Sequence, residues 1–440
     1  GGTDNSWGLL SSSGNLVHNN GDIQTSGAAL SDGDTVGITF DTSNKEAKWY
    51  VEGMLYYTLT LDGNYPFVFG SGSYTSSNTV NFGQKPFKFT PPDGFQALTG
   101  SILRPEKVIP DGSKFVAAVA YAGNSATNKI TTGFAPDFVW IKNRTNGYAH
   151  CLFDTVRGAG KRLESDATYG EDDYNLLNTF RDNGFTLGVQ GGGGAFVQNT
   201  SGVDSMSWSW KAGGNKNTFN IDDVGYASAG AAGLDGGSTN PTGASVNTKS
   251  KFGIYTFDGN SSNRTMSHGL GQQPDFMICK KKSTSGNSWV VWHKGIANTE
   301  YLLLNSSAAK ASDATLFNSH ASDSSTLWTL GSNTTFNESG QSSVAYLWCD
   351  VPGLQKFGTY SGFDNADGPF LELGFRPAII MFKNITSGST EWVILDNKRN
   401  GFNGTGGNNI LFPSTTDAEN ATQYGDFLSN GFKFRVNSSY

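Results

Sequence analysis

Residues 251–255 read Lys-Phe-Gly-Ile-Tyr, and after a polar turn residues 271–274 read Gly-Gln-Gln-Pro. An apolar run, Phe-Met-Ile at 276–278, follows the proline. The same order of a Lys-Phe pair, a polar turn, a Gly-x-x-Pro sequence and an apolar run begins at Lys114 and again at Lys356. The glycine of Gly-x-x-Pro follows the lysine by 19, 20 and 18 residues in chain order. This regular spacing indicates one structural unit that is repeated along the chain.

Composition places the chain among all-β proteins. It has 440 residues, of which 57 are glycine, 13% are aromatic and 36% are hydrophobic, and no window has a sustained helical period. Alternating apolar strands, such as the one at 252–256, bury one face and need a second sheet to cover it. We therefore expect each repeat to be an antiparallel β-sandwich.

The repeat spacing and the composition divide the chain into six expected parts. They are a β domain at 1–98, a Pro-containing linker at 99–113, a first repeat at 114–212, a Gly-, Ser- and Asn-rich linker at 213–249, a second repeat at 250–352 and a third repeat at 353–440. A flexible linker is the simpler interpretation of 213–249. The alternative is an arm that packs on a neighbouring chain through Phe219, Ile221, Val224 and Tyr226.

Aromatic closing strands end the first two repeats, at 206–210 and 344–348. The third repeat reaches Asn430-Gly431-Phe432, which matches Asn183-Gly184-Phe185 of the first, and shows no such strand before Tyr440. We therefore expect the third repeat to be C-terminally incomplete.

The first part resembles the SPRY family. The resemblance covers roughly residues 4–90 and rests on Ser-Trp-Gly at 6–8, Gly-Asp-x-Val-Gly at 33–37, Trp-Tyr-x-Glu-Gly at 49–53, Tyr-Pro-Phe-Val at 65–68 and the sequence at 80–87. It implies a β-sandwich. The opening strands of the family would precede Ser6, so the N-terminal strands of this domain are expected to be missing. Glu52 stands where the family usually has Asn, which leaves the turn type open.

Nearly the whole chain looks like tail-fibre proteins of bacteriophages, particularly those of marine phages. The sequences that carry this resemblance lie at 210–214, 289–294, 301–305, 367–370, 374–377 and 426–433. It implies a virion appendage, often a trimer, that joins other phage tail proteins and touches the host cell surface.

Charge and hydropathy exclude several classes of partner. The net charge of −7 comes without a dense Lys/Arg cluster, whereas a nucleic-acid surface needs a basic stripe. No run of about 18 apolar residues is present, so we expect no membrane insertion. The three cysteines, Cys151, Cys279 and Cys349, have no C-x-x-C spacing, which indicates buried hydrophobic side chains rather than disulfides or zinc ligands.

Two Asp-Arg pairs occupy corresponding positions in the first and third repeats. Asp154 and Asp396 follow the prolines of their Gly-x-x-Pro sequences by 18 and 19 residues, and Arg157 and Arg399 come three residues later. The second repeat has His293 there. A catalytic acid is not normally duplicated in one repeat and lost in another, so we interpret both pairs as structural ion pairs.

Nothing in the sequence identifies an enzyme. Asp4, Glu164, Asp172, Asp173, Asp222, Asp223 and Glu300 are candidates for the two carboxylates of a glycoside hydrolase, but the sequence brings no two of them together. The five histidines are far apart, and no phosphate-binding loop is present. Turn chemistry accounts for the oxygen-rich residues 364–368, although calcium remains an alternative there. We expect no catalytic residue, no metal and no cofactor.

The function we expect is adhesion to the bacterial host surface by glycan recognition. Sugar sites combine aromatic faces with polar side chains on loops, and the candidates are Tyr56, Tyr57, Tyr74, Tyr148 and Trp292, with packing or a subunit interface as the alternative for each. Two other functions stay open: a structural or capsid-decoration fibre, and a polysaccharide depolymerase.

Overall fold

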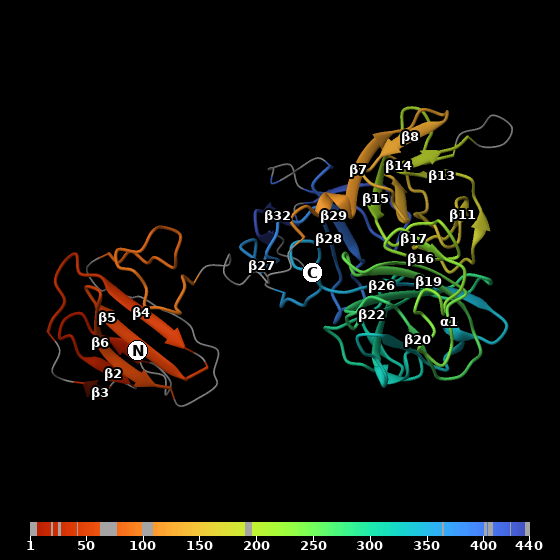
Figure 1. Cartoon of the computed structure of the whole chain (residues 1–440). Coiled ribbons are helices and arrows are strands. Elements are labelled where there is room, and N and C mark those ends of the chain that lie inside the picture. The colour runs from red at the N-terminus through yellow and green to blue at the C-terminus, as the bar shows by residue number, and fades with distance from the viewer. Residues whose placement is uncertain are drawn as a thin grey trace. The chain divides into compact units, whose positions relative to one another are not determined.

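The computed structural model confirms the all-β fold class (Figure 1). It describes residues 7–18, 21–24, 28–41, 43–61, 77–98, 109–189, 196–362, 365–399, 403, 408–422 and 424–435. The chain forms two compact units, Gly1–Arg104 and Pro105–Tyr440. Among the described residues, no helix is both long enough and apolar enough to cross a membrane.

The described residues of the first unit form two antiparallel three-stranded sheets. One contains β1 (Trp7–Leu9), β2 (Leu16–His18) and β3 (Gly21–Gln24), and the other contains β4 (Val36–Asp41), β5 (Glu46–Val51) and β6 (Met54–Thr60). Leu16, Ala47 and Trp49 are the centre of its core. Glu52 and Gly53, which join β5 to β6, have φ values of 49° and 80°. Positive φ at both central residues is the requirement of a type I′ hairpin turn, so Glu52 takes part in this turn.

Within the second unit, residues 114–212 (segment 1) form two facing sheets after a short 3-10 helix, η1 (Gly112–Lys114). The main sheet has the order β10-β9-β15-β7, and the second has the order β13-β14-β8, with a hairpin β11-β12 beside β10. The bounds are β7 (Val116–Ala122), β8 (Asn128–Thr131), β9 (Phe138–Asn143), β10 (Cys151–Asp154), β11 (Lys161–Arg162), β12 (Asp172–Asp173), β13 (Leu177–Arg181), β14 (Gly184–Leu187) and β15 (Asp204–Trp210).

Residues 250–352 (segment 2) repeat this arrangement of strands. Their main sheet contains the order β22-β21-β26-β19, which corresponds to β10-β9-β15-β7, and β20 pairs with β25 as β8 pairs with β14. The bounds are β19 (Phe252–Asp258), β20 (Arg264–Ser267), β21 (Phe276–Lys281), β22 (Val290–His293), β23 (Glu300–Leu303), β24 (Ala311–Ser312), η2 (Asn318–His320), β25 (Leu327–Leu330), α1 (Thr334–Asn337) and β26 (Ser342–Trp348).

Residues 353–440 (segment 3) have the same order in part. The pair β28-β29 corresponds to β9-β10, the hairpin β30-β31 corresponds to β11-β12, and the sheet β27-β33-β32 corresponds to β8-β14-β13. The bounds are β27 (Phe370–Glu372), β28 (Ile379–Phe382), β29 (Val393–Asp396), β30 (Asn408–Ile410), β31 (Asn420–Thr422), β32 (Gly425–Leu428) and β33 (Gly431–Phe434).

The Gly-, Ser- and Asn-rich stretch 213–249 is folded, which corrects the linker interpretation. Its strands β16 (Phe219–Ile221), β17 (Val224–Tyr226) and β18 (Gly243–Asn247) extend the main sheet of segment 2 to nine strands. β18 pairs with β19, and Phe219 is buried in the core of segment 2. Phe219, Ile221 and Tyr226, three of the four apolar residues proposed for an arm, therefore pack on their own chain, whereas Val224 is exposed.

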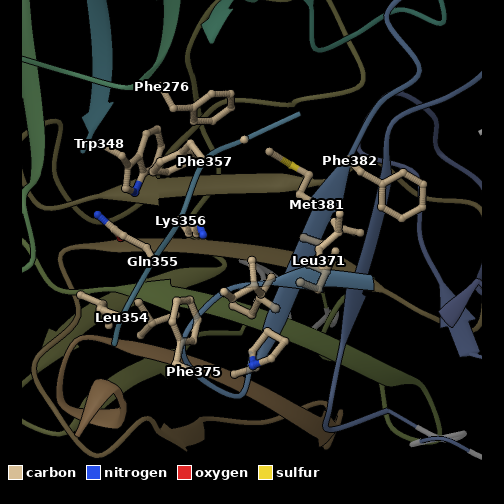
Figure 2. A pocket seen from close by; sticks show the side chains of 18 of the residues that line it. Phe276, Trp348, Leu354, Gln355, Lys356, Phe357, Leu371, Phe375, Met381 and Phe382 are labelled. Atoms are coloured by element: carbon tan, nitrogen blue, oxygen red, sulfur yellow. The ribbon is translucent and has the colours of Figure 1, made fainter. Parts of the chain in front are cut away.

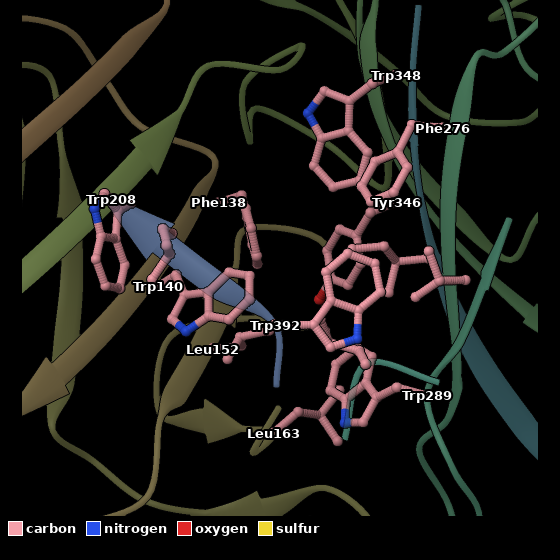
Figure 3. Packing of buried hydrophobic residues seen from close by; sticks show 14 of the residues in the cluster. Phe138, Trp140, Leu152, Leu163, Trp208, Phe276, Trp289, Tyr346, Trp348 and Trp392 are labelled. Atoms are coloured by element: carbon pink, nitrogen blue, oxygen red, sulfur yellow. The ribbon is translucent and has the colours of Figure 1, made fainter. Parts of the chain in front are cut away.

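Each main-sheet strand serves two cores because its successive side chains point to opposite faces. In β9, Val139 and Ile141 face the second sheet of segment 1, whereas Phe138 and Trp140 face the other two segments. β21 and β28 alternate in the same way. Figure 3 shows aromatic side chains from the three segments gathered in this common core, where the rings of Phe138 and Tyr346 are 4.7 Å apart. The three sandwiches are therefore joined by a shared core rather than by extended linkers.

Three buried lysines join the segments in a closed cycle. Lys142 Nζ of segment 1 donates to Thr416 O of segment 3 at 3.1 Å. Lys280 Nζ of segment 2 donates to Thr168 O of segment 1 at 3.1 Å. Lys383 Nζ of segment 3 donates to Ser307 O of segment 2 at 3.1 Å. The three lysines hold corresponding positions in β9, β21 and just after β28, so the segments are related by an approximate threefold rotation.

A second cycle of hydrogen bonds runs in the same direction. Trp289 Nε1 of segment 2 donates to Glu164 O of segment 1 at 2.7 Å, and Trp392 Nε1 of segment 3 donates to Leu303 O of segment 2 at 2.9 Å. In segment 1 the equivalent residue is His150, whose Nε2 lies 3.0 Å from Phe412 O of segment 3. Trp140 Nε1, which can only donate, bonds to His150 Nδ1 at 2.8 Å. His150 is therefore a neutral ring that donates from Nε2.

This neutral histidine predicts loss of stability in mild acid. Burial, with Lys142 and Arg399 nearby, lowers the pKa of His150 well below 6.5, and burial lowers the pKa of His268 to about 4. The unfolded chain binds a proton at each residue near pH 6.5 while the folded chain does not. The contribution to stability is therefore complete above pH 6.5 and falls with decreasing pH, by up to about 1.4 kcal/mol per pH unit for each histidine.

Urea unfolding at pH 7, 6 and 5 measures this slope. His150→Gln should make the decline shallower by up to about 1.4 kcal/mol per pH unit, most clearly between pH 6 and 5, whatever its effect on stability at pH 7. An unchanged slope in the variant would show that His150 is not held neutral.

Candidate functional site

A polar pocket of about 280 Å³ lies between segments 1 and 2. On one side is the β11–β12 hairpin with the loop that joins its strands, and on the other is the loop between β21 and β22. The lining residues are Arg162, Glu164, Tyr169, Gly170, Glu171, Asp172, Ser283, Thr284 and Ser285.

Backbone hydrogen bonds hold the two loops together. Glu171 N donates to Lys282 O at 2.7 Å, and Gly286 N donates to Thr168 O at 2.9 Å. Gly170 N donates to Ser285 Oγ at 3.0 Å, and a Cβ at Gly170 would lie only 3.0 Å from Lys282 O. The glycine thus permits the close approach of the two loops, and the walls of the pocket are fixed before any ligand arrives.

Arg162 organises the charged wall of the pocket. Its guanidinium contacts Asp172 Oδ2 at 2.6 Å and Glu164 Oε1 at 2.7 Å, and it lies 3.9 Å from the ring centre of Tyr174. Burial raises the pKa of Glu164, and the nearby Asp166 and Asp172 add to this effect. The pocket therefore offers carboxylate acceptors in fixed positions.

Tyr169 supplies an aromatic surface beside these acceptors. Its side chain is 62% exposed, although a tyrosine ring is costly to leave in water. A ring face packs against the apolar C–H face of a sugar, while carboxylates and serine hydroxyls bond to its hydroxyl groups. A concave site with one aromatic face and a few fixed polar groups has the chemistry of a small-ligand site.

The same two carboxylates share one cation. Glycoside hydrolysis needs one carboxyl group as acid and another as base or nucleophile, but Arg162 binds both Glu164 and Asp172. The other carboxylates named from the sequence lie elsewhere. Asp173 pairs with Lys161, Asp223 with Lys211 and Glu300 with Lys310, Asp222 accepts from Thr248, and Asp4 lies outside the described residues.

The aromatic residues predicted as ligand contacts are dispersed by the structure. Trp292 is 4% exposed and its ring lies 4.3 Å from that of His320, so it cannot reach an external ligand. Tyr56 donates its hydroxyl to Gly14 O at 2.6 Å, and Tyr57 packs against the core of the first unit. Tyr148, on the loop between β9 and β10, is exposed. Tyr74 lies outside the described residues.

Both predicted ion pairs form and are inaccessible to ligands. Arg157 Nε lies 2.5 Å from Asp154 Oδ2, and Arg399 Nε lies 2.7 Å from Asp396 Oδ2. The side chains in both pairs are at most 1% exposed. Backbone N–H groups of the next turn also donate to each aspartate. Their geometry is that of structural pairs that fix the turn after β10 and β29.

Each of these aspartates also accepts a bond from another segment. Tyr346 Oη of segment 2 donates to Asp154 Oδ2 at 2.7 Å. Trp208 Nε1 of segment 1 donates to Asp396 Oδ2 at 3.1 Å. The ion pairs therefore join segments as well as strands.

The three cysteines are buried. Cys151, Cys279 and Cys349 are free thiols within the cores, as the sequence predicted, and burial raises the pKa of Cys151 to about 12. Among the residues that the structure describes, no three His, Cys, Asp or Glu side chains form a group able to hold a metal ion.

Sequence reasoning missed Tyr169 and Arg162, which carry the pocket. The available signal was the turn at 169–173, Tyr-Gly-Glu-Asp-Asp, in which an aromatic residue precedes three carboxylates. The facing loop at 283–285 is more than a hundred residues away in the chain, so only the fold could bring the two together.

Residues 111–440 match a protein family described as "Domain of unknown function (DUF7483)". No curated protein and no solved structure matches the chain.

Proposed function

We propose that this chain, which belongs to the DUF7483 family over residues 111–440, is an adhesive virion appendage of the tail-fibre type that binds a bacterial surface glycan. The observation that supports binding is the pocket between segments 1 and 2, where the exposed Tyr169 stands beside carboxylates held by Arg162. Arg162 binds both Glu164 and Asp172, and this supports binding of the glycan without cleavage.

A weak site of this size suits a multivalent fibre. Its volume of about 280 Å³ fits one or two sugar residues rather than a long chain. Fibres present several copies of a site together, and avidity then exceeds the affinity of one site by roughly 10² to 10⁴. Assembly as a trimer with other phage tail proteins, at the surface of the virion, belongs to this proposal.

Tyr169→Ala tests the proposal. We expect roughly tenfold weaker binding to the cognate polysaccharide, because the variant loses the aromatic face but keeps the ion-paired wall. The measurement is titration of the purified chain against a panel of bacterial surface polysaccharides, followed by adsorption to cells with the best ligand as competitor.

Tyr148→Ala is the matched control, since it removes an exposed tyrosine from another loop and should leave binding and melting temperature unchanged. Loss of binding in the control alone would move the site to the loop between β9 and β10. No binding to any polysaccharide or cell would favour the structural or capsid-decoration role, and release of reducing sugar would favour a depolymerase.

A further inference from the structure

A large groove of about 1810 Å³, lined by apolar and polar residues, borders segment 3. One wall carries Ile379 and Met381 of β28, and the opposite wall carries Phe276 of β21 together with Phe357. Figure 2 shows Phe276, Trp348 and Phe357 on one side of this space and Met381 on the other. Phe276 and Trp348 are 5% exposed, whereas Phe357, Ile379 and Met381 are half-buried at the groove.

The other two segments have a strand at the equivalent place. In segment 1, β15 lies between β9 and β7, and in segment 2, β26 lies between β21 and β19. In segment 3, β28 corresponds to β9 and β21, and residues 357–362 follow the third Lys-Phe pair. Within the described part of the chain, β29 is the strand that pairs with β28, and the described residues of 357–362 form no ladder. In segment 3 the groove lies where β15 and β26 lie in the other two segments.

The registers of the closing strands β15 and β26 show which side chains of an added strand would face the groove wall. Trp210 lies opposite Phe138 and Trp348 lies opposite Phe276, and the corresponding residue of β28 is Ile379. Two residues earlier in the closing strands, Trp208 lies opposite Trp140 and Tyr346 lies opposite Ile278. The corresponding residue of β28 is Met381. A strand in the groove would therefore need large apolar side chains at alternate positions.

A third cycle of bonds points to the same place. Tyr346 of segment 2 donates to Asp154 of segment 1, and Trp208 of segment 1 donates to Asp396 of segment 3. The third hydrogen bond of this cycle would join segment 3 to segment 2. Its partner in segment 2 would be His293, because His293 lies opposite Phe276 just as Asp154 lies opposite Phe138. His293 lines the groove, and no closing-strand side chain reaches it among the described residues.

The protonation of His293 indicates which side chain could form a hydrogen bond with it. Gly295 N donates to His293 Nδ1 at 2.9 Å, so the neutral ring carries its proton on Nε2. Burial lowers the pKa of His293 and favours this neutral form. A tyrosine hydroxyl can accept from Nε2, whereas an indole N–H cannot. Tyrosine, as at position 346, is thus the better match.

The groove also continues into the shared core. Phe276, Ile278, Trp348, Trp392 and Ile394 belong both to the core and to the groove lining. A strand placed there would extend an interface that already joins the three segments. It would also pair with β28 on the side away from β29, because a sheet edge readily accepts an added strand.

We propose that the groove accepts one antiparallel β-strand from a partner protein, with the alternating aromatic pattern of β26, inserted between β28 and residues 357–362. Segment 3 then has the four-strand order of the other two segments, and the occupant supplies a tyrosine toward His293 and a second large side chain toward Ile379. The groove is an assembly site for a peptide strand and not a site for a small ligand.

Binding of a synthetic peptide tests this proposal. The probe is a peptide with the sequence of β26, Ser342–Trp348, added to the whole purified chain. Its matched control has serine in place of the tyrosine and the tryptophan. We expect saturable 1:1 binding, with the control roughly 30-fold weaker because two buried aromatic anchors are lost. Hydrogen exchange should slow at 379–382 and 357–362 and stay unchanged in β9 and β21.

Met381→Lys places a charge on the groove wall and should abolish peptide binding. If this variant misfolds, hydrogen exchange of the unaltered chain with and without peptide still tests the proposal. Equal binding of the two peptides would overturn the proposal, as would protection of other strands only. A self-associated chain in which 379–382 are already protected before peptide is added would also overturn it, because a second copy would then fill the groove.

Discussion

Asp154→Ala is expected to lower the free energy of unfolding of the second unit by about 3–5 kcal/mol, the usual cost of removing one partner of a buried ion pair. Asp154 is fully buried and accepts from Arg157 Nε, from two backbone N–H groups and from Tyr346 Oη. Alanine leaves the Arg157 guanidinium buried without this aspartate, and its remaining carboxylate, Glu171, lies farther away at 3.1 Å. Equilibrium unfolding in urea measures the loss.

Asp173→Ala is the matched control, because it removes an aspartate whose pair with Lys161 is on the surface. Little change is expected there. Asp396→Ala should resemble Asp154→Ala in stability and leave adsorption to host cells intact. An unchanged unfolding curve for Asp154→Ala together with lost adsorption would instead make these pairs part of a binding site.

The local features of the fold could be predicted from the sequence because they depend on short-range chemistry. Gly-x-x-Pro ends one strand and sets the start of the next, which is why β9, β21 and β28 all begin two residues after the proline. An aspartate three residues before an arginine, at the end of a strand, can bind both the side chain and the turn backbone. The Asp154–Arg157 and Asp396–Arg399 contacts follow from this spacing.

The packing between segments could not be predicted, because strands buried on both faces read as plain apolar runs. Phe-Val-Trp-Ile at 138–141 does not state that Phe138 and Trp140 face other segments while Val139 and Ile141 face their own. For the same reason Trp292 looked available for a ligand although it is buried. The stretch 213–249 looked like a linker because its composition conceals strands as short as three residues.

The candidate site depends on contacts between distant parts of the chain. The turn that carries Tyr169 could be predicted as a polar turn. It becomes part of a pocket because residues 283–285 lie across from it and because Arg162 binds both Glu164 and Asp172. Neither is encoded in local spacing. The approximate threefold cycle explains why such loops meet. In each segment, the end of β9, β21 or β28 bonds through its lysine to a loop of another segment.

Trp289→Ala should destabilise all three segments of the second unit at once, by about 3–5 kcal/mol. Trp289 is fully buried in the shared core, and its indole N–H bonds to Glu164 O of segment 1 at 2.7 Å. Alanine leaves a large cavity among residues of the three segments and removes the indole hydrogen bond to the Glu164 carbonyl of segment 1. If the segments unfold as one unit, the cost appears in each of them, including those that contain no substitution.

Native-state hydrogen exchange of the unaltered chain and of Trp289→Ala, followed strand by strand, tests the shared core most directly. The shared core predicts that the amides of β9 in segment 1, β21 in segment 2 and β29 in segment 3 lose the same opening free energy in the variant. A loss confined to β21 and its neighbours in segment 2, with β9 and β29 unchanged, would mean three independent sandwiches and would contradict the account.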